Sequence, residues 1–519
     1  MGALDVTLLE MRPMYSYPGE YVADFCIVRR DGEYHLLHIR GERWSWPLGY
    51  GKSEIDLGHA VSADLRVWNP REPVLAAGTA GAWDEWGVWA PHVVEHDGLY
   101  YLFYAGTDAR GNQGIGLATS PDLAVWHKHA ASPLVRPGPW SDRERGQGVL
   151  AKDPMVWQEP GSGRFLMYYT ATTADGRACI ATAVSTDLIE WRDLGPAFVE
   201  EDRSYTQCQS PFLVAHGGKF YLFYTAKGGP RNKGSRPEDF AHFEIAYLMS
   251  ASPTGGWIKP RNHRLLEGWS CACELPTFDN VTYFLCIVQE EVQGVWGASV
   301  LSDPHIVTWQ PDGTVAIREC PLDGSDDGRL LFSGLTADLA SLVQHGGVWQ
   351  RDDEGVLIPP ESVGDTYLLD TLWGRDVAFE VEVLSAAGGV GSLLVRANPS
   401  ALAGYRVSLD FDRRSLALSE LFPGAPDRPL QQCAVVLHAG QWHKLKVVLQ
   451  ASFFSVYVDG TLTMIRQSRT YDSGCLGLHA RGPLAFRAVQ ANEWNATAGP
   501  TGEVWRCRSL PQYLRREPE

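Results

Sequence analysis

Short apolar segments, each preceded by a turn with glycine, follow one another along the first three hundred residues. Tyr100–Tyr104 after Gly98 and Phe220–Tyr224 after Gly218 are typical, and both are rich in aromatic residues. Apolar runs of this length that are bounded by glycine and enriched in aromatic or β-branched residues predict β-strands. We therefore expect short strands joined by tight turns.

One phrase recurs among these predicted strands. Asp-Leu-x-x-Trp begins at Asp64, Asp122 and Asp187, and weaker copies end at Trp257 and Trp309. The tryptophans that close the five copies are 58, 65, 66 and 52 residues apart. Each unit holds four predicted strands, and four strands repeated radially form a propeller blade, whereas solenoid repeats run about 20–47 residues. We predict an all-β chain whose residues 1–312 form a five-bladed β-propeller.

A different pattern follows the last repeat. Residues 313–345 are rich in turn residues, with one short helix expected over Ala337–Leu342. From residue 346 to 519, apolar and polar positions alternate, as in Phe379–Val383 and Phe454–Val458. Period-two alternation with one polar face is typical of antiparallel sandwiches. We expect a linker over 313–345 and a jelly-roll-like β-sandwich over 346–519, with a structural or oligomeric role and carbohydrate binding as the alternative.

Composition and charge exclude several kinds of partner. The formal net charge of −17 argues against nucleic acid, which requires clustered lysine and arginine, and against an anionic membrane surface. The chain has no apolar run of the roughly 18 residues that a transmembrane helix needs. Glu10 and Arg12 interrupt the segment where a signal peptide would be apolar, which favours a cytoplasmic protein.

Cysteine spacing gives no sign of a metal centre. Ten cysteines are scattered, no two form a C-x-x-C pair, and Cys271 and Cys273 form a C-x-C without a second half. We therefore expect no metal and no cofactor. The 19 tryptophans and 20 tyrosines suit a β core and also stack on the apolar faces of sugar rings. The expected partner is a small carbohydrate substrate, and a homo-oligomer is left open.

Candidate catalytic carboxylates stand at the start of predicted innermost strands, which converge on one mouth of a propeller. These are Asp24 in blade one, Asp153 in blade three and Glu274 in blade five; by distance from the next proline, Trp89 and Gln209 occupy the position of Glu274 in blades two and four. Glycosidic hydrolysis needs a proton donor and a second carboxylate as nucleophile or base. Apolar neighbours of Asp24 and Glu274 would raise their pKa. For each residue the alternative is a solvated carboxylate at a strand end.

Further candidates would line the mouth and hold substrate. They are Trp44, Trp46, His59, Asp84, Trp89, His92 and Gln209, with His242 as an additional histidine. For each of them the alternative is a packed aromatic ring or a hydrogen-bonded structural side chain.

Two phrases resemble a known family. Residues 58–68 resemble the phrase W-G-H-A-x-S-x-D-L-x-x-W of the β-fructofuranosidases, and Lys152–Pro154 resembles their R-D-P motif. The first domain as a whole resembles the five-bladed glycosidases that comprise those enzymes and the arabinofuranosidase/β-xylosidase group. The resemblance implies that Asp153 stabilises the transition state and that Asp24 is the nucleophile or the general base.

The chain departs from that family at the acid. The family's E-C-P phrase on blade four is here Gln209–Pro211, and glutamine cannot donate a proton as a carboxylic acid does. We expect Glu274 to replace it, with the loop residues Glu201 and Asp202 as alternatives.

The expected function is hydrolysis of a non-reducing-end, furanosidic glycosidic bond. One alternative is a sugar-binding propeller without turnover. Another is a transglycosylase or a phosphorylase on the same fold, in which Arg43, Lys52 or Lys227 would hold phosphate.

Overall fold

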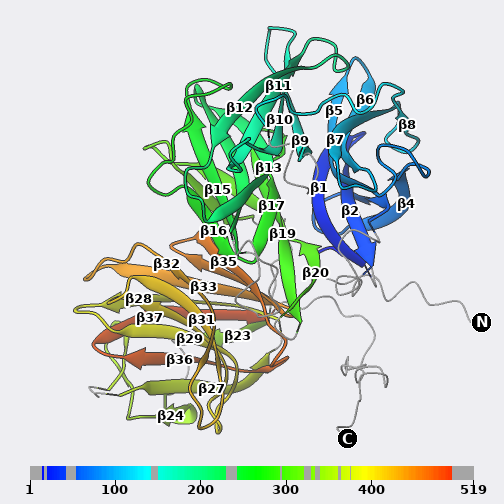
Figure 1. The fold of residues 1–519 in the computed structure, drawn as a ribbon. Coiled ribbons are helices and arrows are strands. Elements are labelled where there is room, and N and C mark those ends of the chain that lie inside the picture. The colour runs from blue at the N-terminus through cyan, green and yellow to red at the C-terminus, as the bar shows by residue number, and fades with distance from the viewer. Residues whose placement is uncertain are drawn as a thin grey trace, which may run out of the picture.

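A computed structural model describes residues 14–16, 20–42, 54–141, 150–228, 242–292, 295–320, 329–333, 339–360, 364–374 and 376–493. These residues form strands and turns, with one short 3-10 helix, η4 (Leu339–Ser341), inside the predicted helical segment. Figure 1 shows a ring of sheets above and a second sheet-rich domain below. Among the described residues no helix is long and apolar enough to span a membrane.

Four antiparallel sheets of four strands make up most of the first domain (Figure 1). The first contains β1 (Glu20–Arg30), β2 (Glu33–Glu42), β3 (Asp56–Ser62) and β4 (Asn69–Ala76), and the second β5 (Gly87–His96), β6 (Leu99–Thr107), β7 (Gln113–Ser120) and β8 (His127–Lys128). The third contains β9 (Lys152–Gln158), β10 (Phe165–Thr172), β11 (Ala178–Ser185) and β12 (Arg192–Val199), and the fourth β13 (Tyr205–His216), β14 (Lys219–Gly228), β15 (His242–Ser250) and β16 (Arg264–Gly268).

Buried clusters join each sheet to the next. Leu37 of the first sheet packs in one cluster with Leu102 of the second. The second and third sheets share another cluster, as do the third and fourth. Because each sheet buries both faces against neighbours, the strands are apolar almost throughout, and the sheets take a β-propeller arrangement. The all-β prediction is confirmed.

The recurring Asp-Leu-x-x-Trp phrase forms the same turn in three sheets. The Asp64 carboxylate accepts hydrogen bonds from the backbone N–H groups of Arg66 and Val67, and Asp122 and Asp187 make the equivalent bonds. The following leucine is buried in each copy and has a positive φ of 64–66°. A carboxylate that bonds the backbone two and three residues on holds such a turn.

The strands after β16 belong to a larger sheet. They are β17 (Ser270–Glu274), β18 (Thr277–Phe278), β19 (Val281–Val292), β20 (Val295–Leu301), β21 (His305–Trp309) and β22 (Val315–Glu319). β19 pairs with β17, β20 and β21, and β22 pairs with β35 of the second domain through Arg318 and Thr461. The last repeat is therefore continuous with the C-terminal sheets.

The C-terminal domain consists of two antiparallel layers. One layer contains β23 (Arg329–Ser333), β25 (Gln350–Arg351), β26 (Leu357–Ile358), β28 (Val377–Ser385), β33 (Trp442–Gln450), β34 (Phe453–Val458), β35 (Thr461–Gln467) and β37 (Leu484–Glu493). The other contains β24 (Val343–His345), β27 (Thr366–Gly374), β29 (Val390–Asn398), β30 (Ala403–Asp410), β31 (Ser415–Leu421), β32 (Arg428–Ala434) and β36 (Gly474–Arg481). Alternate residues of both layers, such as Phe379 and Leu478, meet in one buried cluster.

The segment predicted as a linker is built into these sheets. Within residues 313–345, β22, β23, η4 and β24 are regular elements. A shared cluster that includes Phe284 of β19 and Ile465 of β35 seals the junction, and the ring nitrogen Nε2 of His305 lies 3.1 Å from the Tyr457 hydroxyl. The turn-rich composition failed as a linker signal because the turns join short paired strands.

Candidate functional site

Each innermost strand is broken at the same point by one irregular residue. Ala90, Asp153, Ser210 and Ala272 have φ of 47–54°, and strand register shifts around Asp24 in β1. A left-handed residue other than glycine or asparagine costs of the order of 1–3 kcal/mol and is found at functional sites. The shared irregularity aligns the five strands and turns these five positions toward one pocket, which they line together.

Two of these positions carry aspartates that share a partner. The Ser210 hydroxyl donates to Asp24 Oδ1 at 2.7 Å, and the Ser210 backbone N–H donates to Asp153 Oδ2 at 3.0 Å. Thr170 also donates to Asp153 Oδ2, at 2.8 Å. Ser210 therefore holds together the two aspartates that the sequence analysis named as catalytic candidates.

Burial and mutual repulsion make Asp24 a weak acid. Loss of solvent, and secondly the charge of Asp153, raise the pKa of Asp24 to about 6. The cations Lys152 and Lys227 and the Ser210 hydrogen bond oppose this rise. Asp24 can therefore exchange a proton near neutral pH, which is the property that general acid–base chemistry requires.

Two lysines are the cations of this site. Lys152 Nζ lies 3.3 Å from Asp153 Oδ2. Lys227 comes from β14, and burial, then the charge of Lys152, lower its pKa to about 8. Sequence analysis considered Lys227 only as a phosphate ligand; the structure places its charge where it acts on Asp24 and Asp153.

Glu274 lines the pocket at a different level from the one predicted. The left-handed residues align the strands, and Glu274 lies two residues beyond Ala272. The residues at the same position in β5 and β13 are His92 and Phe212. Trp89 and Gln209 correspond instead to Cys271. The predicted equivalence was wrong because proline spacing does not mark the bulge in β17. Its Oε2 accepts the Ile27 N–H at 3.2 Å, its Oε1 lies 3.9 Å from His92 Nδ1, and burial raises its pKa.

A carboxyl that sequence analysis missed lies outside the lining of this pocket, but close enough to Asp24 for their charges to interact. Glu54, just before β3, is 2% exposed and accepts a hydrogen bond from the Tyr21 hydroxyl. Burial first, and further the charge of Asp24, raise its pKa to about 7, while Tyr21, Lys152 and the Trp89 side chain lower it. No repeat marks Glu54, because it stands on none of the innermost strands.

The structure places the predicted substrate-binding residues in different surroundings. Trp89 adjoins Ala90 of the pocket and interacts with Glu54, whereas the Gln209 amide donates to Gln207. His92 lies behind the pocket and its Nε2 donates to the Val156 carbonyl at 3.1 Å. Trp44, Trp46 and the side chain of His242 lie outside the described residues, as do Arg43 and Lys52.

Two candidates are structural. His59 lies on β3, 3.0 Å from a nitrogen of His35, and burial lowers its pKa to about 4. Asp84 is buried and bonded to the Lys128 ammonium at 2.5 Å and the Tyr104 hydroxyl at 3.0 Å. Neither lines the pocket. Their contacts are with side chains of neighbouring strands, because a polar residue in a motif can face a neighbouring strand.

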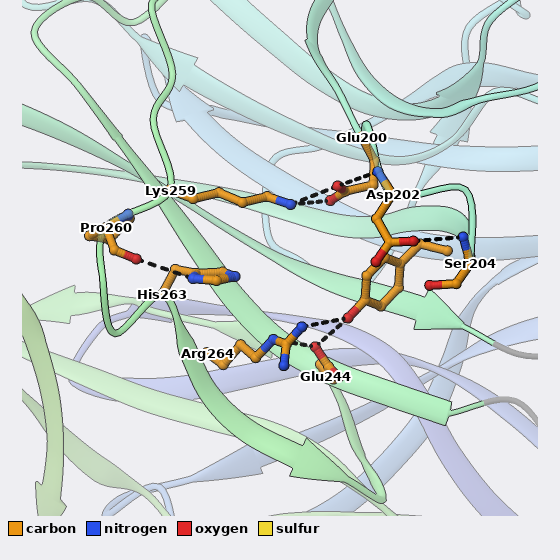
Figure 2. A network of polar contacts seen from close by, with 9 residues as sticks. Glu200, Asp202, Ser204, Glu244, Lys259, Pro260, His263 and Arg264 are labelled. Carbon is orange, nitrogen blue, oxygen red and sulfur yellow. Dashed lines mark hydrogen bonds and ion pairs between the residues drawn. The ribbon is translucent and has the colours of Figure 1, made fainter. Parts of the chain in front are cut away.

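The alternative loop carboxylates lie in a separate network (Figure 2). Asp202 accepts the Ser204 N–H at 2.9 Å within its own turn. Beside it, Lys259 pairs with Glu200 at 2.6 Å, while Glu244 accepts from Tyr205 and Arg264. Glu201, next in the chain, is exposed. These contacts give the loop a structural role, and none of them reaches Asp24 or Asp153.

Comparison with known proteins agrees with the geometry. The family model "Glycosyl hydrolases family 43" matches residues 20–166 and 148–273. A levanase of Bacillus sp. (strain L7) is 30% identical over 200 residues, which cover 35% of this chain but only 19% of the levanase. A probable arabinan endo-1,5-α-L-arabinosidase A of Aspergillus flavus is 25% identical over 258 residues, which cover 46% of this chain and 68% of that protein.

Solved structures share the fold of nearly the whole chain. An exo-inulinase of Aspergillus awamori superposes with a TM-score of 0.67 at 14% identity, covering 92% of this chain and 96% of its own. A GH32 β-fructofuranosidase of Bombyx mori gives 0.64 at 17% identity, covering 94% and 96%.

The β-propeller arrangement, its paired aspartates and these matches make the chain similar to the propeller glycoside hydrolases. The matched proteins fall in the group that joins invertases and levanases with arabinanases. Among the described residues no three histidine, cysteine or acidic side chains gather to hold a metal ion.

Proposed function

We propose that the protein hydrolyses a furanosidic glycosidic bond at a non-reducing end. The observation that carries the proposal is the pair of aspartates, Asp24 and Asp153, held by Ser210 at one pocket on the axis of the propeller. The named activities of the matched relatives, levanase and arabinan endo-1,5-α-L-arabinosidase, support a furanoside as the substrate.

Each aspartate has a role that suits its surroundings. Asp24 attacks the anomeric carbon or removes a proton from the attacking water, since its pKa of about 6 leaves it ionised at neutral pH. Asp153, beside Lys152 and bonded by Thr170 and Ser210, stays in place and stabilises the positive charge that develops on the sugar ring. Glu274, which the sequence analysis expected to donate the proton, also lines this pocket.

We also propose that β17–β21 act as a fifth blade that closes the ring. On one side, Ser299 of β20 donates to the Val22 carbonyl of β1 at 2.5 Å, and both strands contribute to one buried cluster. On the other side, the Ala272 N–H of β17 donates to Thr225 of β14 at 2.8 Å. A closed ring leaves no free sheet edge and fixes the five bulges around one axis.

Hydrolysis of a panel of substrates tests the activity. Sucrose, inulin, levan, arabinan and 4-nitrophenyl furanosides are incubated with the native protein and with Asp24→Asn and Asp153→Asn. Each variant should lose about 10²–10⁴-fold in kcat on the accepted substrate. Full activity of Asp24→Asn contradicts the assignment. Binding by calorimetry without turnover would instead support a sugar-binding propeller.

A second candidate, phosphorolysis, is favoured by two half-buried lysines. Lys152 and Lys227 both lower the pKa of Asp24, and Lys227 pairs in register with Gln207, two residues before the Gln209 that stands in place of the acid. Adding inorganic phosphate to the reaction and analysing products by mass spectrometry separates the two reactions. A glycosyl phosphate identifies phosphorolysis, and the free sugar alone identifies hydrolysis.

A further inference from the structure

The site lacks a proton donor at the position where the related enzymes carry one. Gln209 has a neutral amide, and its Nε2 already donates to Gln207. The other carboxyl in the pocket, Glu274, lies a level further along the strands and is held by the Ile27 N–H beside His92. A carboxylic acid that acts on a leaving oxygen must be protonated at working pH and lie at the level of Asp24.

Glu54 sits between two aromatic side chains of that level. Tyr21 precedes Asp24 on β1 and donates its hydroxyl to Glu54 Oε1. Trp89 precedes Ala90 of the pocket on β5, and its side chain lowers the pKa of the same carboxyl. Glu54 therefore lies close to residues of two innermost strands, β1 and β5.

Glycines make room for this arrangement. A Cβ on Gly41 would lie 2.5 Å from the Tyr21 ring, so only glycine lets that ring pack across β2 with its hydroxyl toward Glu54. A Cβ on Gly87 would lie 3.0 Å from the Glu54 carbonyl oxygen and 3.1 Å from Trp89 Nε1. The backbone is shaped to bring Glu54 and its two aromatic partners together.

The charge environment keeps the proton on this carboxyl. Glu54 is 2% exposed, and burial outweighs the charge of Lys152, which lowers its pKa. Burial and the nearby charge of Asp24 raise its pKa to about 7, against about 6 for Asp24 itself. Between about pH 6 and about pH 7, Asp24 is therefore mostly ionised and Glu54 mostly protonated. Opposite protonation states of two carboxyls in one site assign one as the base and the other as the acid.

We propose that Glu54 is the proton donor of the reaction, in place of the glutamine on blade four. The inference rests on the proposed glycosidase activity. As the bond between the anomeric carbon and the leaving oxygen breaks, its electron pair goes to that oxygen, and the Glu54 proton is transferred to it. Asp24 supplies the attack on the anomeric carbon, either directly or through water. If Asp24 attacks directly, water then breaks the bond between Asp24 and the anomeric carbon, and Glu54 regains its proton from that water. If Asp24 activates the water, Asp24 takes the water's proton, and exchange with solvent restores both carboxyls.

Leaving groups of different basicity test the role of Glu54. An oligosaccharide leaves as an alkoxide that needs a proton, whereas 4-nitrophenolate leaves without one. Glu54→Gln should lower kcat on the oligosaccharide about 10²–10⁴-fold, and should lower kcat on the 4-nitrophenyl glycoside of the same sugar by less than about tenfold. The alkaline limb of the pH profile of kcat/KM should disappear in the same variant.

Two control variants isolate the effect. Glu274→Gln removes the rival carboxyl, and Glu200→Gln removes a buried carboxyl of the network in Figure 2, away from the pocket. Glu200→Gln should leave the ratio of kcat on the two substrates as it is in the native protein, and Glu274→Gln should change both kcat values by the same factor. Thermal unfolding of Glu54→Gln at pH 8 should occur at or above the native temperature, which separates a lost proton donor from a lost structural contact.

The outcomes distinguish this inference from the proposed function. If the native protein turns over no glycoside, the proposed function fails. If the native protein is active and Glu54→Gln keeps both rates and the alkaline limb, Glu54 is not the donor and the inference is overturned. If Glu274→Gln alone shows selective loss on the oligosaccharide, the sequence-based assignment is correct and Glu54 is not the donor.

Discussion

Ser210→Ala is the sharpest test of how the aspartates are tuned. The substitution removes the hydroxyl that donates to Asp24 at 2.7 Å but keeps the backbone N–H that donates to Asp153. Alanine fits this backbone, because Ala90 and Ala272 occupy the equivalent bulges with φ of 47°. The perturbation therefore falls on Asp24 alone.

The size of the effect follows from the strength of that bond. A hydrogen bond to a charged group contributes about 1.5–3 kcal/mol, and one pKa unit corresponds to about 1.36 kcal/mol. Removing the bond should therefore raise the pKa of Asp24 by about 1–2 units, from about 6 toward about 7–8. At neutral pH a large share of Asp24 would be protonated and inactive.

The assay is the pH dependence of kcat/KM on the accepted furanoside. The acid limb should move upward by about 1–2 units in Ser210→Ala, and the maximum at high pH should be largely kept. Ser62→Ala is the matched control, since Ser62 bonds the turn carboxylate of Asp64 in the first blade. An acid limb that stays in place in Ser210→Ala would falsify the assignment of Asp24 as the group that must be ionised.

Other changes probe the charges around the pocket. Lys152→Met should move the acid limb of the kcat/KM profile to higher pH and Asp153→Asn to lower pH, because the lysine lowers and the aspartate raises the pKa of Asp24; shifts in the same direction would contradict this. The raised pKa of Glu54, about 7 against 4.5, gives stability that is complete below about pH 4.5 and lost as pH rises through about 7; by pH 8 this amounts to roughly 3 kcal/mol. Chemical denaturation should show that Glu54→Gln loses less free energy of unfolding than the native protein as the pH rises to 8. An equal loss in both proteins would count against the raised pKa of Glu54. Asp84→Asn should cost about 2–4 kcal/mol in the same measurement by leaving its lysine partner unpaired, with kcat of the folded enzyme unaltered.

The local sequence was sufficient to predict features that are held together by contacts between residues close in the chain. The Asp-Leu-x-x-Trp turn is closed by hydrogen bonds within four residues, so its copies could be counted along the chain. Asp24 and Asp153 were found because each stands at the start of an innermost strand, and a ring of such strands converges by symmetry. The period-two alternation of the C-terminal domain likewise predicted a domain rich in β-sheet.

Register in the last innermost strand required the tertiary structure. Distance to the next proline aligned Glu274 with Gln209, but the bulge in β17 lies at Ala272 and shifts the correspondence by three residues. A bulge is set by the pairing of two strands across the sheet, and one strand's sequence does not specify it.

The sequence by itself determined an all-β chain with a repeat, and it singled out two aspartates and a glutamine as candidate site positions. The tertiary structure decided which other carboxyl can serve. Glu54 belongs to no motif, and it reaches the site because the ring packs Tyr21 and Trp89 from two blades against it. Its pKa of about 7 is likewise a product of burial and of the charge on Asp24. The position and the pKa of Glu54 arise from contacts between residues distant in the chain, so composition and spacing along the sequence cannot predict them.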